Sequence, residues 1–317
     1  MLMIVTLAHG ALDAQAQPAS APRWVTLGTQ GGPIVRHSTA QISNALVVGD
    51  GVYLFDMGNG VLRQMEGAGL SIGKVRAAFI THHHRDHNAD TGVVMFEHGA
   101  RKAEGVPPLK LIGPRGTEAF ADALLAAQAA RVVAAGESPR TPIPSIVDSI
   151  DLRDLMEEPT LVYQDDNVTV SAITVDHFFS VPGQTTENEP RAVAYRAEVD
   201  GKVFVYSGDT GAMTPALETL SQGADVLICE VMLVQIAEDV PRSHVGPEHV
   251  AAIAEAANVR SVVLTHYLPA PPWNQSVIED ALNLMRPIYQ GKVAAARDLD
   301  RFNADGDRIG AAGVEAQ

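Results

Sequence analysis

The chain has 317 residues, of which 46% are hydrophobic and 19% charged, and its formal net charge is −15. This apolar content excludes disorder over most of the length and is enough for one large or two medium domains. The acidic balance argues against broad electrostatic capture of nucleic acid, which needs a basic surface. The single cysteine, Cys229, excludes an intrachain disulfide and lies in an apolar run typical of a buried strand.

The first 23 residues turn from apolar to a composition rich in Ala, Gln, Pro and Ser, and Ala14-Gln15-Ala16 matches a small-x-small cleavage site. The basic start of a signal peptide is missing and the apolar stretch is short. We expect a signal peptide, and therefore export to the periplasm or the exterior. The alternative is a disordered tail on a cytoplasmic protein. The remainder, residues 24–317, is expected to form a single domain, and no other stretch is long and apolar enough to span a membrane.

After this segment the chain reads as alternating strands and helices. Gly49-Asp50-Gly51 joins two β-rich runs and predicts a hairpin, and a short helix ending in Gly follows. Strands are then expected at 75–81 and 109–113, with an Ala-rich helix over 117–135. Residues 136–159 are rich in Pro, Ser and acidic residues, and we expect them to form an irregular connection or lid.

The second half continues the alternation. The expected elements are a strand at 167–177, a hairpin over 191–210, a strand at 224–232, a helix over 246–259, a strand at 260–267 and a helix over 275–285. Asp200-Gly201 marks the hairpin turn, and Pro247 marks the first turn of the helix that follows.

Four polar residues each come just after one of the predicted strands: His82, His177, Asp209 and His266. In layered α/β folds such strand ends gather at one edge of a sheet, where functional sites are built from loops. The sequence therefore predicts that these distant residues converge.

The run FITHHHRDHN, residues 79–88, carries metal-ligating side chains at tight spacing: His82, His84, Asp86 and His87. Imidazole and carboxylate ligands suit Zn²⁺, and also Mn²⁺ or Fe. A tight turn would aim the first two histidines at one ion, and Asp86 and His87 at a second ion nearby. We therefore expect two divalent metal ions, with zinc favoured, and no ligand role for His83 or Arg85. The alternative, a solvent-exposed histidine tract, leaves the three partners at other strand ends unexplained.

This constellation resembles the metallo-β-lactamase superfamily, and within it the branch that holds ribonuclease Z and arylsulfatase-like hydrolases. The motif His82-x-His84-x-Asp86-His87 is specific to that superfamily. Further similarity lies in LGTQGGP, FDMGNG, AYRAE, YSGDT and SVVLTH, so the resemblance spans residues 24–300. It implies an α/β fold, a four-layer αββα metallo-β-lactamase sandwich in one domain, with the di-metal site at one edge of the sheets.

By resemblance, His82, His84 and His177 would bind the first metal ion. Asp86, His87 and His266 would bind the second, and Asp209 would bridge both. Asp56 matches an early strand-end aspartate that would orient a ligand histidine. The alternative for Asp56 is a turn-capping role beside Gly58.

Three residues are expected to serve catalysis: His244, Glu230 and Asp86, the last in addition to metal binding. In the ribonuclease Z-like branch a histidine at the place of His244 assists proton transfer to the leaving group, and an imidazole titrates in the right range. Glu230 would orient that histidine; a strand-end salt bridge is the alternative for Glu230.

The resemblance implies hydrolysis in which a metal-bridging hydroxide attacks and His244 protonates the departing alkoxide. Ribonuclease Z members grip transfer RNA with a Gly-rich basic arm, which the region between His87 and His177 lacks, and FDMGNG departs from their Cys-Gly-Glu-Gly form. We therefore expect a small-molecule ester, a phosphodiester or a sulfate, with nucleic acid disfavoured.

Three alternatives stay open at this point. A ribonuclease Z-like endoribonuclease that processes the 3′ side of transfer RNA is the first, and hydrolysis of a lactone or β-lactam is the second. A metal-binding protein without catalysis is the third. A homodimer is implied only by the resembling branch.

Overall fold

The structure is a computed structural model, and it describes residues 21–137, 146–152, 155–178, 191–211, 215–233, 243–268 and 275–311. Of the predicted signal peptide or tail, residues 1–20 lie outside these ranges. Among the helices within them, none has both the length and the apolar character that crossing a membrane requires.

One sheet has eight strands in the order β15-β14-β1-β2-β3-β4-β5-β6. Their bounds are β1 (Arg23–Gly28), β2 (Ser43–Val48), β3 (Gly51–Met57), β4 (Val75–Phe79), β5 (Leu109–Gly113), β6 (Val147–Asp151), β14 (Asp300–Asn303) and β15 (Arg308–Ala311). Strands β3 to β6 pair in parallel, whereas β1 pairs antiparallel with both β2 and β14. The first and nearly the last strand of the domain therefore lie side by side.

The second sheet has seven strands in the order β13-β12-β11-β10-β9-β8-β7. Their bounds are β7 (Thr160–Gln164), β8 (Thr169–Val175), β9 (Ala192–Val199), β10 (Lys202–Tyr206), β11 (Val226–Met232), β12 (Ser261–Leu268) and β13 (Lys292–Ala295). Strands β10 to β13 are parallel, and β7 to β10 form antiparallel pairs.

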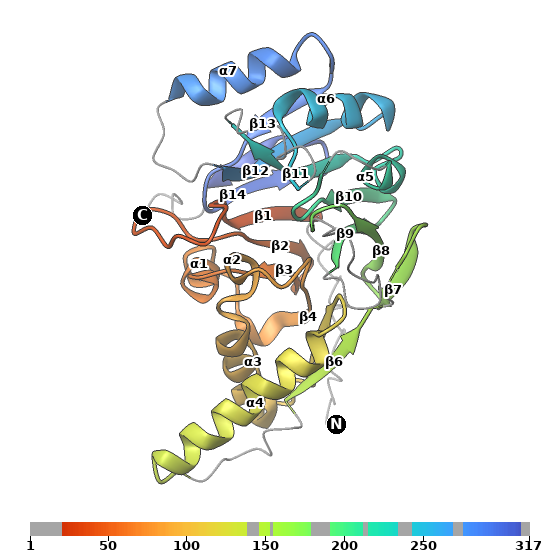
Figure 1. Cartoon of the computed structure of the whole chain (residues 1–317). Helices are drawn as coiled ribbons and strands as arrows, with labels where there is room; N and C mark the ends of the chain where they lie inside the picture. The colour runs from red at the N-terminus through yellow and green to blue at the C-terminus, as the bar shows by residue number, and fades with distance from the viewer. Residues whose placement is uncertain are drawn as a thin grey trace, which may run out of the picture.

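Helices cover the outer face of each sheet (Figure 1). Their bounds are α1 (Val61–Gly67), α2 (Arg85–Asn88), α3 (Thr91–Gly99), α4 (Thr117–Ala134), α5 (Ala216–Leu220), α6 (Pro247–Ala256) and α7 (Gln275–Met285), with short 3₁₀ helices η1 (Ile72–Lys74) and η2 (Ala100–Glu104). The first sheet packs on α1, α3 and α4, and the second on α5, α6 and α7. The expected four-layer αββα sandwich in a single domain is confirmed.

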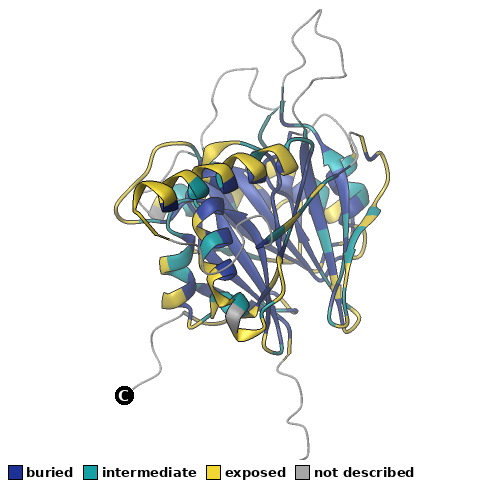
Figure 2. Cartoon of the chain, turned by 90° about the horizontal axis from the view of Figure 1, so that it is seen from below, coloured by how far each residue is buried: buried dark blue, intermediate teal, exposed yellow. Residues whose placement is uncertain are grey.

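The layer between the two sheets is an aromatic core. Phe55 packs between Trp24 and Phe79, with ring centroids 5.1 Å and 4.9 Å away, and Tyr195 and Tyr206 pack on them from the second sheet. Most strands are buried while the outer faces of the helices are exposed (Figure 2); the edge strands β6 and β7 are half-buried to exposed. Because strands covered on both faces read as continuous apolar runs, this burial explains why central strands such as β4, β5, β11 and β12 were recognisable in the sequence.

One predicted element needs correction. Residues 136–159 were expected to be an irregular connection or lid, yet the described part contains strand β6, which pairs in parallel with β5. Its burial alternates between half-buried and exposed, because it is the edge strand and only one face meets the rest of the molecule. Acidic residues are common on such an exposed edge. Because β6 contains them, it lacks the apolar run from which the other strands were predicted.

Candidate metal centre

Seven side chains from separate parts of the chain converge at one edge of the sandwich. They come from the turn after β4 and helix α2 (His82, His84, Asp86 and His87), from the segment after β8 (His177), from the segment after β10 (Asp209) and from β12 (His266). The predicted convergence is therefore present in the fold. The polar edge lies where the parallel strands of both sheets end, which is the usual place for a site in such folds.

The first group consists of three imidazoles and one carboxylate. The Nδ1 atom of His84 lies 2.9 Å from His82 Nε2 and 3.1 Å from His177 Nε2. The Oδ2 atom of Asp209 lies 3.8 Å from His82 Nε2 and 3.7 Å from His177 Nε2. Burial lowers the pKa of all three histidines, that of His177 to about 4, so the rings are neutral and their lone pairs are available.

The second group forms around His87 and His266, whose Nε2 atoms lie 3.2 Å apart. Asp209 Oδ1 lies 3.2 Å from the first of these nitrogens and 3.1 Å from the second. Asp86 Oδ2 lies 3.7 Å from His87 Nε2 and 3.4 Å from His266 Nε2. Asp209 therefore presents one carboxylate oxygen to each group, which is the arrangement of a bridging carboxylate.

The donor set fits two metal ions. Four ligand atoms about 2.0–2.1 Å from a tetrahedral zinc ion lie about 3.3 Å apart, and the separations in both groups scatter around that value. Asp209 is almost fully buried, and its Oδ1 atom has no hydrogen-bond partner among the described residues. A buried carboxylate oxygen without a donor is costly unless a cation meets it. The His and Asp groups could thus hold metal ions.

Asp56 supports the second group from behind. Its Oδ2 atom lies 2.8 Å from His87 Nδ1 and accepts a hydrogen bond of 2.8 Å from the Tyr206 hydroxyl, while its Oδ1 atom accepts one from the Thr81 backbone amide. Asp56 has a φ of 60°, a left-handed conformation that Asp tolerates better than most residues. The contact to His87 is the one that the orienting role requires, and it fixes the ring so that Nε2 faces the site.

His266 departs from the predicted pattern, because it lies within β12 and not after it. The parallel register between β11 and β12 shifts at this point: Glu230 pairs with Thr265 and Val231 with Tyr267, which leaves His266 as the extra residue of a bulge. Its φ of 43° belongs to this bulge. The bulge turns the side chain into the site while the strand continues, a common use of bulges beside functional sites.

The loop after β1 forms one wall of the site and is held by a partly buried aspartate. Asp298 Oδ1 accepts hydrogen bonds from the Thr29 amide and hydroxyl, and Oδ2 accepts them from the Ala40 amide and from Gln64 Nε2. The loop in turn reaches the site, since the Gly32 amide donates to Asp86 Oδ2 over 2.7 Å. Sequence reasoning did not single out Asp298, because an aspartate before a short C-terminal strand carries no motif.

His244, which is partly buried, and Glu230, which is buried, form a pair beside the second oxygen of Asp209. Glu230 Oε2 lies 2.6 Å from His244 Nδ1, and Asp209 Oδ2 lies 3.9 Å from the same nitrogen. Burial alone would lower the pKa of His244, but the Glu230 carboxylate outweighs it and raises the pKa to about 9. His244 is therefore protonated at neutral pH. Glu230 therefore forms an ion pair with His244, the residue that it was predicted to orient.

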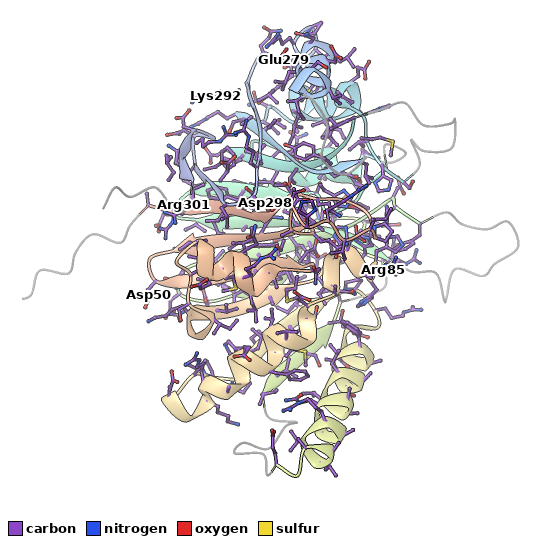
Figure 3. The ribbon with its side chains drawn as sticks, turned by 90° about the vertical axis from the view of Figure 1, so that its left-hand side faces the viewer. Asp50, Arg85, Glu279, Lys292, Asp298 and Arg301 are labelled. Carbon is purple, nitrogen blue, oxygen red and sulfur yellow. The ribbon has the colours of Figure 1, made fainter. Side chains whose placement is uncertain are left out.

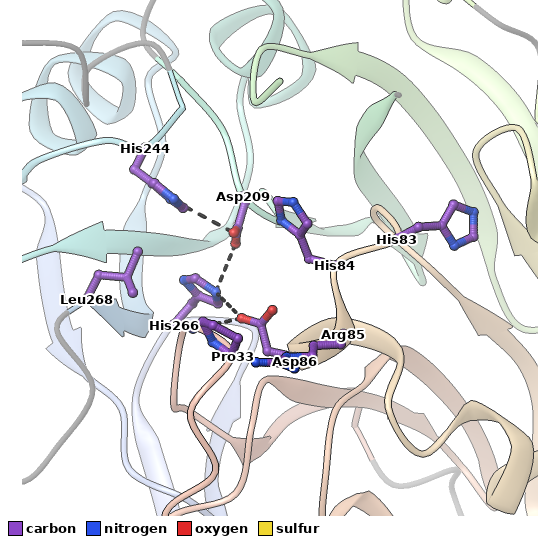
Figure 4. Close-up of a pocket in the computed structure, with 10 residues that line it drawn as sticks. Pro33, His83, His84, Arg85, Asp86, Asp209, His244, His266 and Leu268 are labelled. Carbon is purple, nitrogen blue, oxygen red and sulfur yellow. Dashed lines mark hydrogen bonds and ion pairs between the residues drawn. The ribbon is translucent and has the colours of Figure 1, made fainter. Parts of the chain in front are cut away.

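These residues open into a cavity of about 540 Å³, drawn in Figure 4. Its described lining consists of Gly32, Pro33, His83, His84, Arg85, Asp86, Asp209, His244, His266 and Leu268. The His83 ring points away from the cluster and contacts Thr117 and Phe120, and neither His83 nor Arg85 belongs to either ligand group. Sequence reasoning missed the apolar wall of Pro33 and Leu268, whose residue types signal nothing on their own.

Comparison with known proteins places the fold and the site in a family. Residues 52–267 match the family described as the beta-lactamase superfamily domain. The chain belongs to the metallo-β-lactamase superfamily. The family match, the relatives and the donor set identify the chain as a metal-dependent hydrolase. The imidazole and carboxylate ligands of this metallo-β-lactamase superfamily protein suit several divalent metals.

Relatives of this superfamily protein extend over most of its length. A protein of Mycobacterium marinum named ribonuclease Z is 30% identical over 290 residues, which cover 87% of this chain and 97% of that protein. The metallo-β-lactamase fold protein YhfI of Bacillus subtilis superposes with a TM-score of 0.65 at 19% identity, covering 89% of this chain and 99% of that one. The short form of human tRNase Z gives a TM-score of 0.61 at 19% identity, with coverages of 89% and 99%. Both structures show the fold.

One expectation about partners is wrong. We expected a small-molecule ester and disfavoured nucleic acid, yet the relatives over 87% of the chain are ribonucleases by name. The expectation rested on the net charge and on a missing basic arm. Net charge describes the whole surface, whereas the chemistry of cleavage depends on the few groups at the site.

Proposed function

We propose that this protein hydrolyses phosphodiester bonds in RNA, as the name ribonuclease Z indicates for its relatives. The observation that supports this most directly is the pairing of two features in one chain. The similarity to these relatives covers nearly their whole length, and the site holds both metal-ligand groups together with a protonated histidine. A sulfate ester or a lactone would suit the metal groups alone, but no comparison favours either.

We assign the metal-binding groups as the geometry arranges them. His82, His84 and His177 would hold one ion, Asp86, His87 and His266 the other, and Asp209 both. When bound, two divalent ions would lower the pKa of a water molecule, polarise the phosphoryl oxygen and balance the charge that develops there.

The remaining residues act around this centre. His244, held by Glu230 through Nδ1, carries a proton at neutral pH and lines the cavity, so it is placed to give that proton to the departing ribose oxygen. Asp86 accepts a hydrogen bond from the Gly32 amide, which fixes its carboxylate toward His266. Pro33 and Leu268 supply apolar surface that excludes water from one side.

A cleavage panel on purified, metal-loaded protein tests the proposal. The substrates are a precursor transfer RNA with a 3′ trailer, a bis-aryl phosphodiester and an aryl sulfate. His244→Ala and Asp209→Asn remove a proton donor and a ligand, and Asp305→Asn, in the exposed β14–β15 turn, is the matched control for a lost carboxylate.

The expected result is cleavage of the RNA and of the phosphodiester by the wild-type protein and the control variant. Cleavage should be lost in Asp209→Asn and strongly reduced in His244→Ala. Turnover of the aryl sulfate with neither RNA nor phosphodiester cleaved would refute the proposal.

A further inference from the structure

Arg85 is a positively charged residue to which neither metal binding nor proton transfer has been assigned. It lies between His84 and Asp86, is exposed, and lines the cavity beside Asp86 (Figure 4). Among the described residues that line the cavity, Arg85 is the one side chain with a permanent positive charge. The negative charges of the cavity lining are Asp86 and Asp209. Its guanidinium makes no hydrogen bond or ion pair with the part of the chain that the structure describes.

The two residues that flank Arg85 in the chain, His84 and Asp86, are both fixed by contacts within the metal centre. His84 caps helix α2, of which Arg85 is the first residue, and the His84 ring sits in the first ligand group. On the other side Asp86 accepts from the Gly32 amide and lies beside His266. The nearest acidic neighbour in the chain is therefore already engaged by other donors. The backbone that carries the Arg85 side chain is therefore fixed, and the five N–H donors of its guanidinium are available.

The chemistry of the cavity then specifies what Arg85 can bind. A guanidinium presents parallel N–H donors that match the oxygens of a phosphate, and it is charged at every working pH. Pro33 and Leu268, which also line the cavity, have side chains with no donor and no charge. An anionic group that enters the cavity can therefore bind to Arg85, whose positive charge is permanent.

We propose that Arg85 binds a non-bridging oxygen of the substrate phosphate and so makes the site prefer anionic phosphodiesters over neutral esters. This inference rests on the proposed phosphodiester hydrolysis, whose site it extends by one binding residue. Arg85 acts in binding and not in proton transfer. Its removal should therefore raise KM and leave kcat nearly unchanged.

The experiment compares Arg85→Gln and Arg85→Lys with the wild-type protein. Arg76→Gln is the matched control: it removes the same charge from the start of β4, where Arg76 faces Asp50 at 3.8 Å. Asp50 and Arg85 lie on opposite sides of the molecule (Figure 3). Steady-state kinetics are measured on RNA, on a bis-aryl phosphodiester and on a neutral aryl ester, at several salt concentrations.

We expect Arg85→Gln to raise KM for both phosphodiesters about tenfold or more, with kcat within about twofold, since a charge-assisted hydrogen bond is lost. The slope of log KM against log salt on RNA should become shallower by about 0.7, the value for one lost phosphate contact on a single strand. Arg85→Lys should recover part of the loss, and hydrolysis of the neutral ester should not change. An unchanged KM in Arg85→Gln, or equal effects on neutral and anionic esters, would overturn the inference.

A binding measurement separates this inference from the proposed function. Inorganic phosphate is titrated into the metal-loaded wild-type, Arg85→Gln and Arg76→Gln proteins by calorimetry. If the wild-type protein cleaves no phosphodiester yet binds phosphate at least about tenfold more tightly than Arg85→Gln does, the proposed function fails while the inference stands. Equal phosphate affinity in all three proteins would refute the role of Arg85.

Discussion

The Nδ1 atom of His244 lies 2.6 Å from Glu230 Oε2; the Glu230 side chain is buried, whereas His244 is partly buried and lines the cavity. This contact fixes the tautomer and the direction of the ring, because a nitrogen that faces a carboxylate carries a proton. The other ring nitrogen is then the one that is available to the cavity. The pair is thus a proton donor with its own orienting group.

His244→Ala is expected to lower kcat for RNA cleavage about 10²–10⁴-fold and to leave KM within a few fold, as for loss of a general acid. Glu230→Gln keeps an acceptor but removes the charge, so its loss of kcat should be smaller. Single-turnover cleavage measures both variants, and the metal content of each should equal that of the wild-type protein. Wild-type kcat in His244→Ala would show that another group gives the proton.

Asp209→Asn tests the bridging position. The carboxylate presents one oxygen to each ligand group, at 3.7 Å from His177 and 3.1 Å from His266, and an amide offers one oxygen only. We expect the bound metal to fall from two ions per chain to one or fewer, whereas His82→Ala should empty the first group alone. Elemental analysis after dialysis measures the stoichiometry. Two tightly bound ions in Asp209→Asn would rule out a bridge.

Asp56→Asn tests the orienting group. Asn tolerates the left-handed φ of 60° at this position, so the backbone is preserved while the charge beside His87 is lost. We expect metal affinity of the second group to fall about 10–100-fold, measured by competition with a chromophoric chelator. Tyr206→Phe removes one hydrogen bond to Asp56 and should weaken affinity less. Unchanged affinity in Asp56→Asn would favour a purely local role for Asp56 at its turn.

The fourth prediction concerns stability against acid. Asp165 accepts hydrogen bonds from the hydroxyls of Tyr53 and Tyr163 and from the amides of Asn167 and Val168. Burial would raise the pKa of Asp165, but these donors outweigh it and hold the pKa below its ordinary value. A lowered folded-state pKa stabilises the fold above about pH 4, and this stability is lost as pH falls through the folded-state pKa.

Asp165→Asn should therefore cost about 1–2 kcal/mol at pH 7, discounted because the site is partly exposed. The difference from the wild-type protein should shrink as pH falls below about 4. Urea unfolding at a series of pH values measures it, with Asp166→Asn as a neighbouring control. A difference that is constant from pH 7 to pH 3 would contradict the assignment.

The sequence predicted those parts of the site that are encoded locally. The cluster His82, His84, Asp86 and His87 occupies one turn after one strand, so its spacing alone indicates shared ligation. The apolar strands of both sheets are buried on both faces, so they too were visible in the sequence. The partners His177, Asp209 and His266 could be named only because each lies at or near the end of such a strand.

What escaped prediction depends on contacts between distant segments. The bulge at His266 follows from a register shift between β11 and β12, and no residue type marks it. Edge strand β6 is acidic and half exposed, so it reads as a loop. Asp298 contacts Thr29, Ala40 and Gln64, more than 230 residues away, and no local pattern shows such a partner. The predicted signal peptide and export stay a prediction.

The position of Asp298 has a consequence for how the protein is made. The loop that carries Gly32 to Asp86 is anchored by Asp298, and strand β1 completes its pairing only with β14. A ribosome that has translated the whole metal cluster, up to His266, has still not produced either anchor. We therefore expect nascent chains stalled before residue 298 to lack a finished site, so that activity appears only after Asp298 and strand β14 have been synthesised, although every metal ligand precedes them in the chain.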